Sequence, residues 1–298
     1  MQINKGKLSA SLIAILFGVF TIWQQEMVRY LWMQGKGQLS IMSNTVPIEH
    51  ILKSDTLSAK SRFLLELIPE IKSFAKNTLG LIPDDNYTKY YNQNGKPILW
   101  ALTACPPYSL EAYKWGFPFL GELEYKGFFE KSAGSMELEE LRNQGFDVDL
   151  GEVGAWSTLG ILSDPILSSM LELDTGNFVR LLLHEMTHAT VYIADAGVFN
   201  ENMATFIGDR GAMQFLIQQF GKNSSVVRRY KETLDDIELF SEYTVAYSKS
   251  INLLYNSLPA DATIWPIMKQ KSFTAYKNRL YLLPFNHKKR FQKLQESE

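Results

Sequence analysis

The segment His184-Glu185-Met186-Thr187-His188 constrains the fold more than any other, because it sets two histidines four residues apart around a glutamate. On a helix these two positions lie on one side, about 6 Å apart, so both imidazoles can reach a single metal ion. Glu185 is rotated by about 100° from His184 and can reach a metal-bound water without ligating the metal. The spacing therefore predicts a helix that carries a metal site, with Glu185 as a general base for hydrolysis.

The chain has so few cysteines and histidines that a metal site must be built from histidine and carboxylate side chains. Cys105 is the single cysteine of the chain, which excludes an intramolecular disulfide, a cysteine-based zinc finger and an iron–sulfur cluster. Of the four histidines, His50 and His287 lie far from the motif and are expected to be surface or loop residues. A site of two histidines and a carboxylate suits Zn²⁺. The competing interpretation is a histidine pair that is hydrogen-bonded in the core.

Residues on either side of the motif indicate where its helix begins and ends. Asp174 or Thr175 can cap the start, and Gly197 can end the helix. The interior is apolar on most faces, so the helix is expected to be buried.

A third protein ligand is needed, and two downstream carboxylates are candidates. Asn200 is a good helix N-cap, which places Glu201 in the first turn of the next helix. In a tight antiparallel hairpin, however, Asp209 would lie closer to His188 than Glu201 does. Glu201 is the predicted ligand, and Asp209 is the alternative, either as ligand or as a carboxylate that holds an imidazole N–H. Asp195 is a weaker candidate.

The N-terminal part of the chain has the pattern of a membrane anchor. Eighteen consecutive uncharged residues run from Leu8 to Gln25, after Lys5 and Lys7. A helix of that length spans about 27 Å, close to the thickness of a bilayer's hydrocarbon core. No site of small residues for signal cleavage follows it. We expect residues 1–28 to be an uncleaved single-pass anchor in a bacterial inner membrane. The rest of the chain would then face the periplasm or the exterior. A buried core helix is the alternative.

The rest of the chain, residues 29–298, is predicted to form one α+β domain. Apolar residues recur at helical spacing over 58–79, with a kink expected at Pro69. Short segments rich in aromatic and β-branched residues predict a small sheet with one helix near 136–144; the strands are expected at 97–104, 116–125 and 147–156. Residues 177–277 are expected to be almost wholly helical. The net charge of −2 argues against a nucleic-acid partner.

The stretch from about Gly37 to Phe215 resembles a family of bacterial, membrane-associated aminopeptidases that carry the H-E-x-x-H motif. The matching segments are GQLSI, PIEHIL, YKGFF, WSTLG, SDPILSSM, LLLHEMTHATVYI and FNENMATFIG. The resemblance implies a zincin-like fold of the gluzincin type, in which a glutamate on the following helix completes the site, and so favours Glu201. Thr205 stands where thermolysin-like gluzincins have an acidic residue, and Trp156 where related members often have tyrosine.

The function expected from these features is that of a zinc-dependent peptidase acting on peptides or proteins. His184, His188 and Glu201 are the predicted metal ligands, and aminopeptidase specificity rests on the resemblance alone. The alternative is a membrane-anchored zinc-binding module that does not hydrolyse peptides. Secondary candidates are a strand over 151–160 that could pair with a substrate, and tyrosines that could stabilise an oxyanion, namely Tyr192, Tyr243 and Tyr247.

Overall fold

The computed structural model describes residues 25–82, 85–117, 121–153, 163–193 and 196–291. The chain is helix-rich α+β. Its α-helices are α2 (Gln25–Ser43), α3 (Ile48–Leu52), α4 (Ala59–Glu66), α5 (Ile68–Leu79), α6 (Lys131–Asn143), α7 (Thr175–Thr190), α8 (Gly197–Phe220), α9 (Ser225–Asn256) and α10 (Trp265–Leu282). Short 3₁₀ turns are η1 (Ser168–Glu172), η2 (Ala262–Ile264) and η3 (Lys288–Phe291).

The strands are short and form three small sheets. The first sheet has the order β6 (Lys126–Phe128), β3 (Trp100–Cys105), β7 (Asp147–Glu152), and all of its pairs are antiparallel. The second has the order β1 (Val46–Pro47), β2 (Lys89–Tyr91), β8 (Ile166–Leu167), with β2 and β8 parallel. The third is the hairpin of β4 (Trp115–Phe117) and β5 (Gly121–Leu123).

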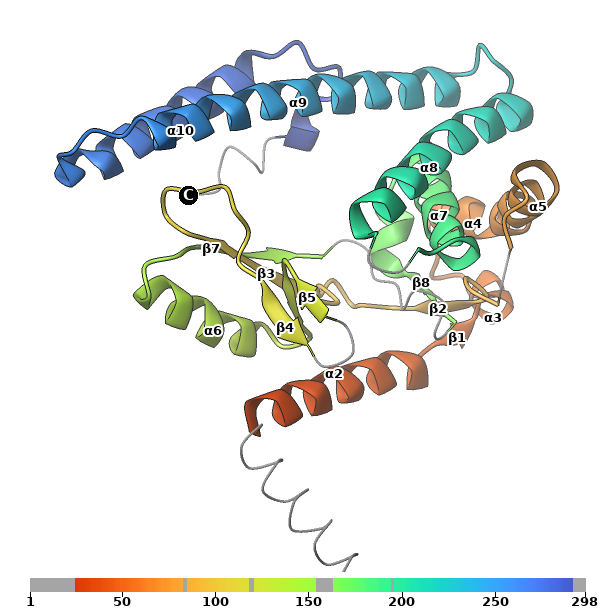
Figure 1. The fold of residues 1–298 in the computed structure, drawn as a ribbon. Coiled ribbons are helices and arrows are strands. Elements are labelled where there is room, and N and C mark those ends of the chain that lie inside the picture. Colours follow the sequence, from red (N-terminus) through yellow and green to blue (C-terminus); the bar gives the residue numbers. More distant parts are fainter. Residues whose placement is uncertain (1–24, 83–84, 118–120, 154–162, 194–195, 292–298) are drawn as a thin grey trace, which may run out of the picture.

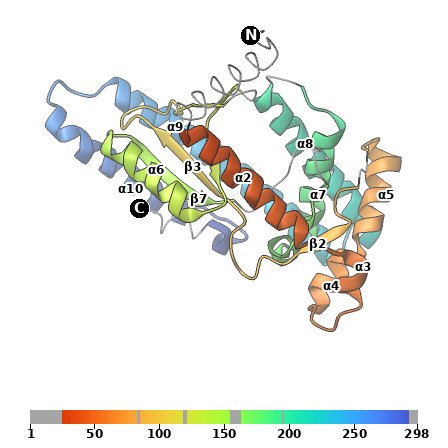
Figure 2. The ribbon, with the colours of Figure 1, turned by 90° about the horizontal axis from the view of Figure 1, so that it is seen from below.

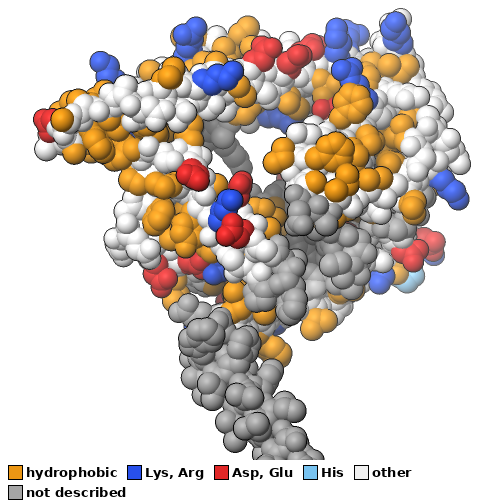
Figure 3. All heavy atoms as spheres, in the orientation of Figure 1, with side chains coloured by type: hydrophobic (Ala, Val, Ile, Leu, Met, Phe, Trp, Pro, Cys, Tyr) orange, Lys and Arg blue, Asp and Glu red, His pale blue; other side chains and the backbone are white. Residues whose placement is uncertain are grey.

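The elements are arranged in two halves that α9 and α10 overlie (Figure 1). One half holds α3, α4, α5, α7 and α8, and the other holds the β3 sheet with α6 against it. The long helices α9 and α10 lie side by side across one end, and their hydrophobic side chains are visible along that arm (Figure 3). Seen from the opposite end, α2 crosses in front of both halves (Figure 2).

Each half has its own apolar core. The larger core joins α4, α5, α7, α8 and the start of α9, and its fully buried members include Leu64, Ile71, Phe178 and Leu216. The smaller core lies between the β3 sheet, α6 and α2, around Leu102 and other buried side chains. Because α7 runs through the larger core, its position is fixed on several sides, which a metal-binding helix requires.

The predicted helical content is confirmed, with differences at element boundaries. The 58–79 segment is two helices that break at Leu67, and Pro69 stands in the first turn of α5, where its missing N–H costs nothing. The predicted helix at 136–144 begins earlier, at Lys131. The strand expected over 116–125 is instead the β4–β5 hairpin.

The predicted anchor falls almost wholly on residues 1–24, which lie outside the described residues. Among the helices of the described part, none has both the length and the apolar character that a membrane crossing requires.

Candidate metal centre

Helix α7 carries the His-Glu-x-x-His motif, and its start is the one expected from the sequence. Asp174 caps it by accepting a hydrogen bond from the backbone N–H of Asn177 at 3.0 Å. Its apolar face is fully buried in the larger core, through Phe178, Val179, Leu182, Leu183 and Met186. The helix is therefore locked in rotation, which fixes the direction in which the two histidines point.

The prediction that Gly197 ends this helix is wrong. Helix α7 ends at Thr190, and Gly197 is the first residue of α8. The prediction that Asn200 is the N-cap of the next helix is also wrong, because Asn200 lies inside α8 and is 1% exposed.

Asn200 holds the connection between the two helices. Its side-chain Nδ2 donates to the carbonyl of Ile193 at 2.7 Å, and its Oδ1 accepts from the N–H of Ile193 at 3.0 Å. This paired bond ties the segment after α7 to the first turn of α8. Because α7 ends at Thr190 and α8 begins at Gly197, the connection comes before Gly197 and is not centred on it, so Glu201 lies beside the histidines.

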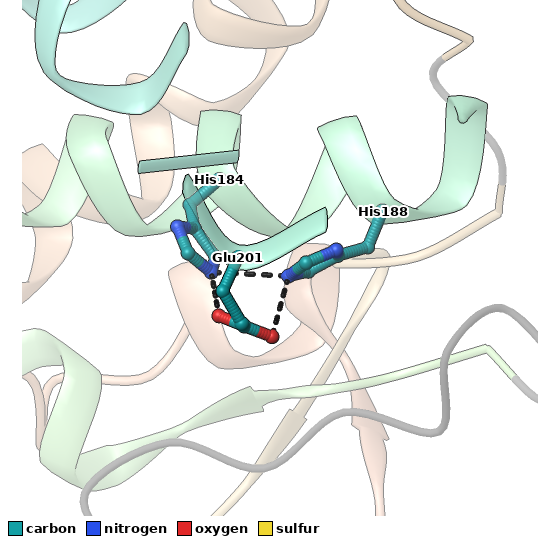
Figure 4. A group of neighbouring side chains, drawn as sticks. All are labelled: His184, His188 and Glu201. Carbon is teal, nitrogen blue, oxygen red and sulfur yellow. Dashed lines mark hydrogen bonds and ion pairs between the residues drawn. The ribbon is translucent and has the colours of Figure 1, made fainter. Parts of the chain in front are cut away.

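The donor atoms of His184, His188 and Glu201 converge on one point (Figure 4). The Nε2 atoms of the two histidines are 3.1 Å apart. Glu201 Oε1 lies 3.3 Å from Nε2 of His188, and Oε2 lies 3.5 Å from Nε2 of His184. The three side chains come from two helices and form a group that could hold a metal ion.

These separations fit a tetrahedral ion. Ligand atoms about 2.05 Å from such an ion lie about 3.3 Å from one another. The two Nε2 atoms are 3.1 Å apart, and each has a different oxygen of Glu201 at 3.3 or 3.5 Å. The side chain of His188 is 4% exposed and that of Glu201 is 65% exposed. The group thus lies at the boundary between core and solvent, where a substrate can approach from the glutamate side.

The environment of His184 favours the neutral form of its imidazole. Burial lowers the pKa of His184 from its ordinary value, and the neighbouring His188 lowers it further, while Glu201 acts in the opposite direction. Neutral imidazole is the form that binds metal ions. In the described ranges, Nδ1 of both rings is buried and has no hydrogen-bond partner.

The alternative ligand, Asp209, lies elsewhere. Its carboxylate forms an ion pair with Arg180, which is one turn before His184 on α7. Asp209 is not in the group of converging donors, and no hydrogen bond from it to an imidazole is present in the described residues. Asp195, the weaker candidate, lies outside the described residues.

The remaining candidate residues are not among the three converging side chains. Glu185 is half-buried on α7, directly after His184. Tyr243 and Tyr247 bond to residues of α10, so their hydroxyls serve the packing of α9 on α10, whereas Tyr192 is exposed after the end of α7. Of the substrate-pairing strand expected over 151–160, Gly151 and Glu152 belong to β7, and residues 154–160, with Trp156 among them, lie outside the described residues. His50 is exposed on α3, and His287 faces Glu232.

Sequence reasoning missed the residue that sets the spacing of α7 and α8. Gly208 packs against α7 so closely that a Cβ there would lie 3.0 Å from the carbonyl oxygen of Arg180 and 3.3 Å from Cβ of His184. The Arg180–Asp209 pair joins the helices at the same level. A glycine two turns after the predicted ligand glutamate was the signal available, since a small residue allows two helix backbones to approach.

We expect Gly208→Ala to lower stability by about 1–3 kcal/mol and to weaken metal binding, because the new methyl group must push α8 away from backbone atoms of α7. Gly197→Ala is the matched control, since nothing lies within 4 Å of a Cβ at the first residue of the same helix. Urea unfolding and titration of both variants with a divalent metal ion measure the effect. Equal metal affinities for Gly208→Ala and Gly197→Ala would contradict it.

The site and fold together define a helix-rich α+β protein with a potential metal site built from a helix pair. A protein-family model described as "putative aminopeptidase" matches residues 29–297. The chain therefore belongs to this family, which suggests a peptidase. The match extends further at both ends than the resemblance seen from about Gly37 to Phe215. Searches of curated proteins and of solved structures gave no significant match.

Proposed function

We propose that the chain is a zinc-dependent peptidase whose metal is held by His184, His188 and Glu201. The observation that carries this proposal is the convergence of two imidazole nitrogens and a carboxylate, 3.1–3.5 Å apart, in a chain of an aminopeptidase family. Two histidines on one helix and a glutamate on the next make the donor set expected of a gluzincin-like zinc site. A zincin-like domain over residues 29–298 is part of the proposal.

The chemistry divides between the ion and one protein residue. When bound, Zn²⁺ would supply Lewis acidity that polarises a peptide carbonyl and acidifies a water molecule. Glu185 follows His184 on α7 and is half-buried, and its carboxylate is the group to which we assign the proton of the attacking water. The same carboxyl group then returns that proton to the leaving amine, which completes hydrolysis without a net change in the enzyme.

His184 and His188 contribute through their fixed orientation. The buried face of α7 holds both rings, and the lowered pKa of His184 keeps that imidazole available as a ligand near neutral pH. Glu201 contributes a negative charge at the exposed side of the group. With one negative and two neutral ligands, a bound Zn²⁺ would leave the site with a net positive charge. That charge would stabilise the oxyanion that develops on the peptide carbonyl.

A peptide-library digest with the full chain tests the proposal. We expect cleavage that stops after treatment with a chelator and returns when zinc is added. Digestion of N-terminally acetylated peptides alongside free ones measures the aminopeptidase specificity that the family description suggests. Stoichiometric zinc without cleavage of any peptide would instead favour the non-hydrolytic zinc-binding module and overturn the proposed activity.

A further inference from the structure

Helix α2 is held against the body by one face, which fixes the direction of the other. The hydroxyl of Tyr30 and the side-chain amide of Gln34 both donate to the carbonyl of Gly127, at 2.9 and 2.6 Å. At Gly37 the helix touches the ring of Phe129, and a Cβ there would lie 2.3 Å from ring carbons. These contacts recur at helical spacing, so the rotation of α2 about its axis is determined.

The opposite face of α2 is apolar and exposed. Trp32 is 76% exposed and Leu39 is 69% exposed, and Leu31 and Val28 are exposed beside them. The four residues recur at helical spacing and form a stripe along the helix. Figure 2 shows that α2 is the foremost element on its side of the molecule. Isolated exposed apolar residues are ordinary, but a continuous stripe centred on a tryptophan marks an interaction surface.

Charged residues border this stripe on the side that faces α6. Arg29 and Lys36 are exposed on α2 itself. Between α2 and α6 lies an open groove of about 330 Å³, which Trp32 lines together with Glu130 and Glu140. An apolar stripe with an aromatic ring and charges of both signs at its margins matches a phospholipid interface, which has the same order of apolar, aromatic and zwitterionic layers.

We propose that the exposed face of α2 lies in the plane of a phospholipid bilayer, with Trp32 and Leu39 below the headgroups. The run of uncharged residues from Leu8 ends at Gln25, the first residue of α2, so a chain held by that run brings this face to the membrane surface. The contact is distinct from a membrane-spanning anchor, because it involves a helix that also packs on the folded body. It does not depend on the proposed peptidase activity.

A second copy of the chain is the main rival occupant. Self-association through the stripe would bring the exposed cations beside it, Arg29 and Lys36, of two chains together. Each pair of copies would thus gain like-charge repulsion along the same seam, whereas lipid headgroups offer phosphates to both cations. The two exposed cations beside the stripe therefore favour the bilayer.

Spin labels on the full chain test the proposal. In a Cys105→Ser background, Leu39→Cys labels the stripe, and Ile267→Cys labels an equally exposed position on α10, at the opposite end of the molecule (Figure 1). The protein is reconstituted in vesicles of phosphatidylcholine with a minority of phosphatidylglycerol. Collision rates with oxygen and with a water-soluble nickel chelate then give the depth of each label.

We expect the label at position 39 to lie about 5–10 Å below the headgroup level, shielded from nickel, and the label at 267 to remain in water. Equal nickel accessibility at both positions would overturn the proposal. Dipolar coupling between labels at position 39 of two chains, without shielding by lipid, would overturn it in favour of a dimer. Circular dichroism of both variants checks that each is folded.

Discussion

Replacing Glu185 with glutamine is expected to lower the rate of peptide hydrolysis by about 10²–10⁴-fold while the protein keeps its metal. Glutamine has the shape of glutamate but cannot accept the proton of the attacking water. The donor atoms of His184, His188 and Glu201 do not include Glu185, so the metal site should survive. Single-turnover kinetics and elemental analysis of the same preparation measure both quantities.

Glu172→Gln is the matched control, because Glu172 is exposed just before the start of α7, at the end remote from the motif. It removes the same charge from the same region and should leave hydrolysis unchanged. If Glu185→Gln retained full activity, the proton-transfer role would be wrong. If it lost its zinc instead, Glu185 would belong to the metal site and the assignment of ligands would need revision.

Replacing Glu201 with alanine is expected to weaken zinc binding by more than about 100-fold, beyond the 10–100-fold typical of residues that only support a ligand. Glu201 provides both oxygens that face the imidazoles, at 3.3 and 3.5 Å. Asp209→Asn should change zinc affinity by less than about tenfold, because Asp209 is paired with Arg180. Competition titration against a chromophoric chelator gives the affinities of both variants and of the unmodified chain.

The pair of variants distinguishes the two carboxylates that the sequence left as alternatives. A larger loss of affinity in Asp209→Asn than in Glu201→Ala would reverse the assignment. Thermal unfolding with and without zinc is an independent measurement of zinc binding, because a ligand that binds only the folded state raises the melting temperature. Glu201→Ala should lose that zinc-dependent rise, and Asp209→Asn should retain it.

Local spacing was enough to predict the helix of the motif and its beginning. The i, i+4 histidines and the apolar residues around them indicate one helix, and Asp174 has the capping role that its side chain suggests. These features depend on neighbours within one or two turns, so a single sequence contains the information.

The end of that helix depends on contacts that a local pattern does not show. Asn200 has the residue type of an N-cap, but its amide bonds instead to the backbone of Ile193, and α8 begins three residues earlier. Glu201 lies beside His188 because α7 ends at Thr190 and the connection comes before Gly197. A simple hairpin centred near Gly197 would have placed Asp209 closer to His188, whereas Glu201, the predicted ligand that the family resemblance also favours, is the carboxylate beside the imidazoles.

The small sheets show a second limit of sequence reasoning. Strand β3 is six residues long and was recognised from its composition, with a shifted start. Strands β1 and β8 have two residues each, too few for any alternation of apolar and polar residues to appear. Their pairing with β2 arises from tertiary packing beside the larger core.

X-ray absorption at the zinc edge, on the purified full chain, tests the central claim most directly. The account predicts one zinc per chain, with two imidazole nitrogens at about 2.0–2.1 Å and oxygen ligands completing the shell. Chelation followed by addition of zinc should restore the same spectrum. A folded protein without stoichiometric zinc would contradict the account, as would a sulfur ligand at about 2.3 Å, which would point to Cys105 instead.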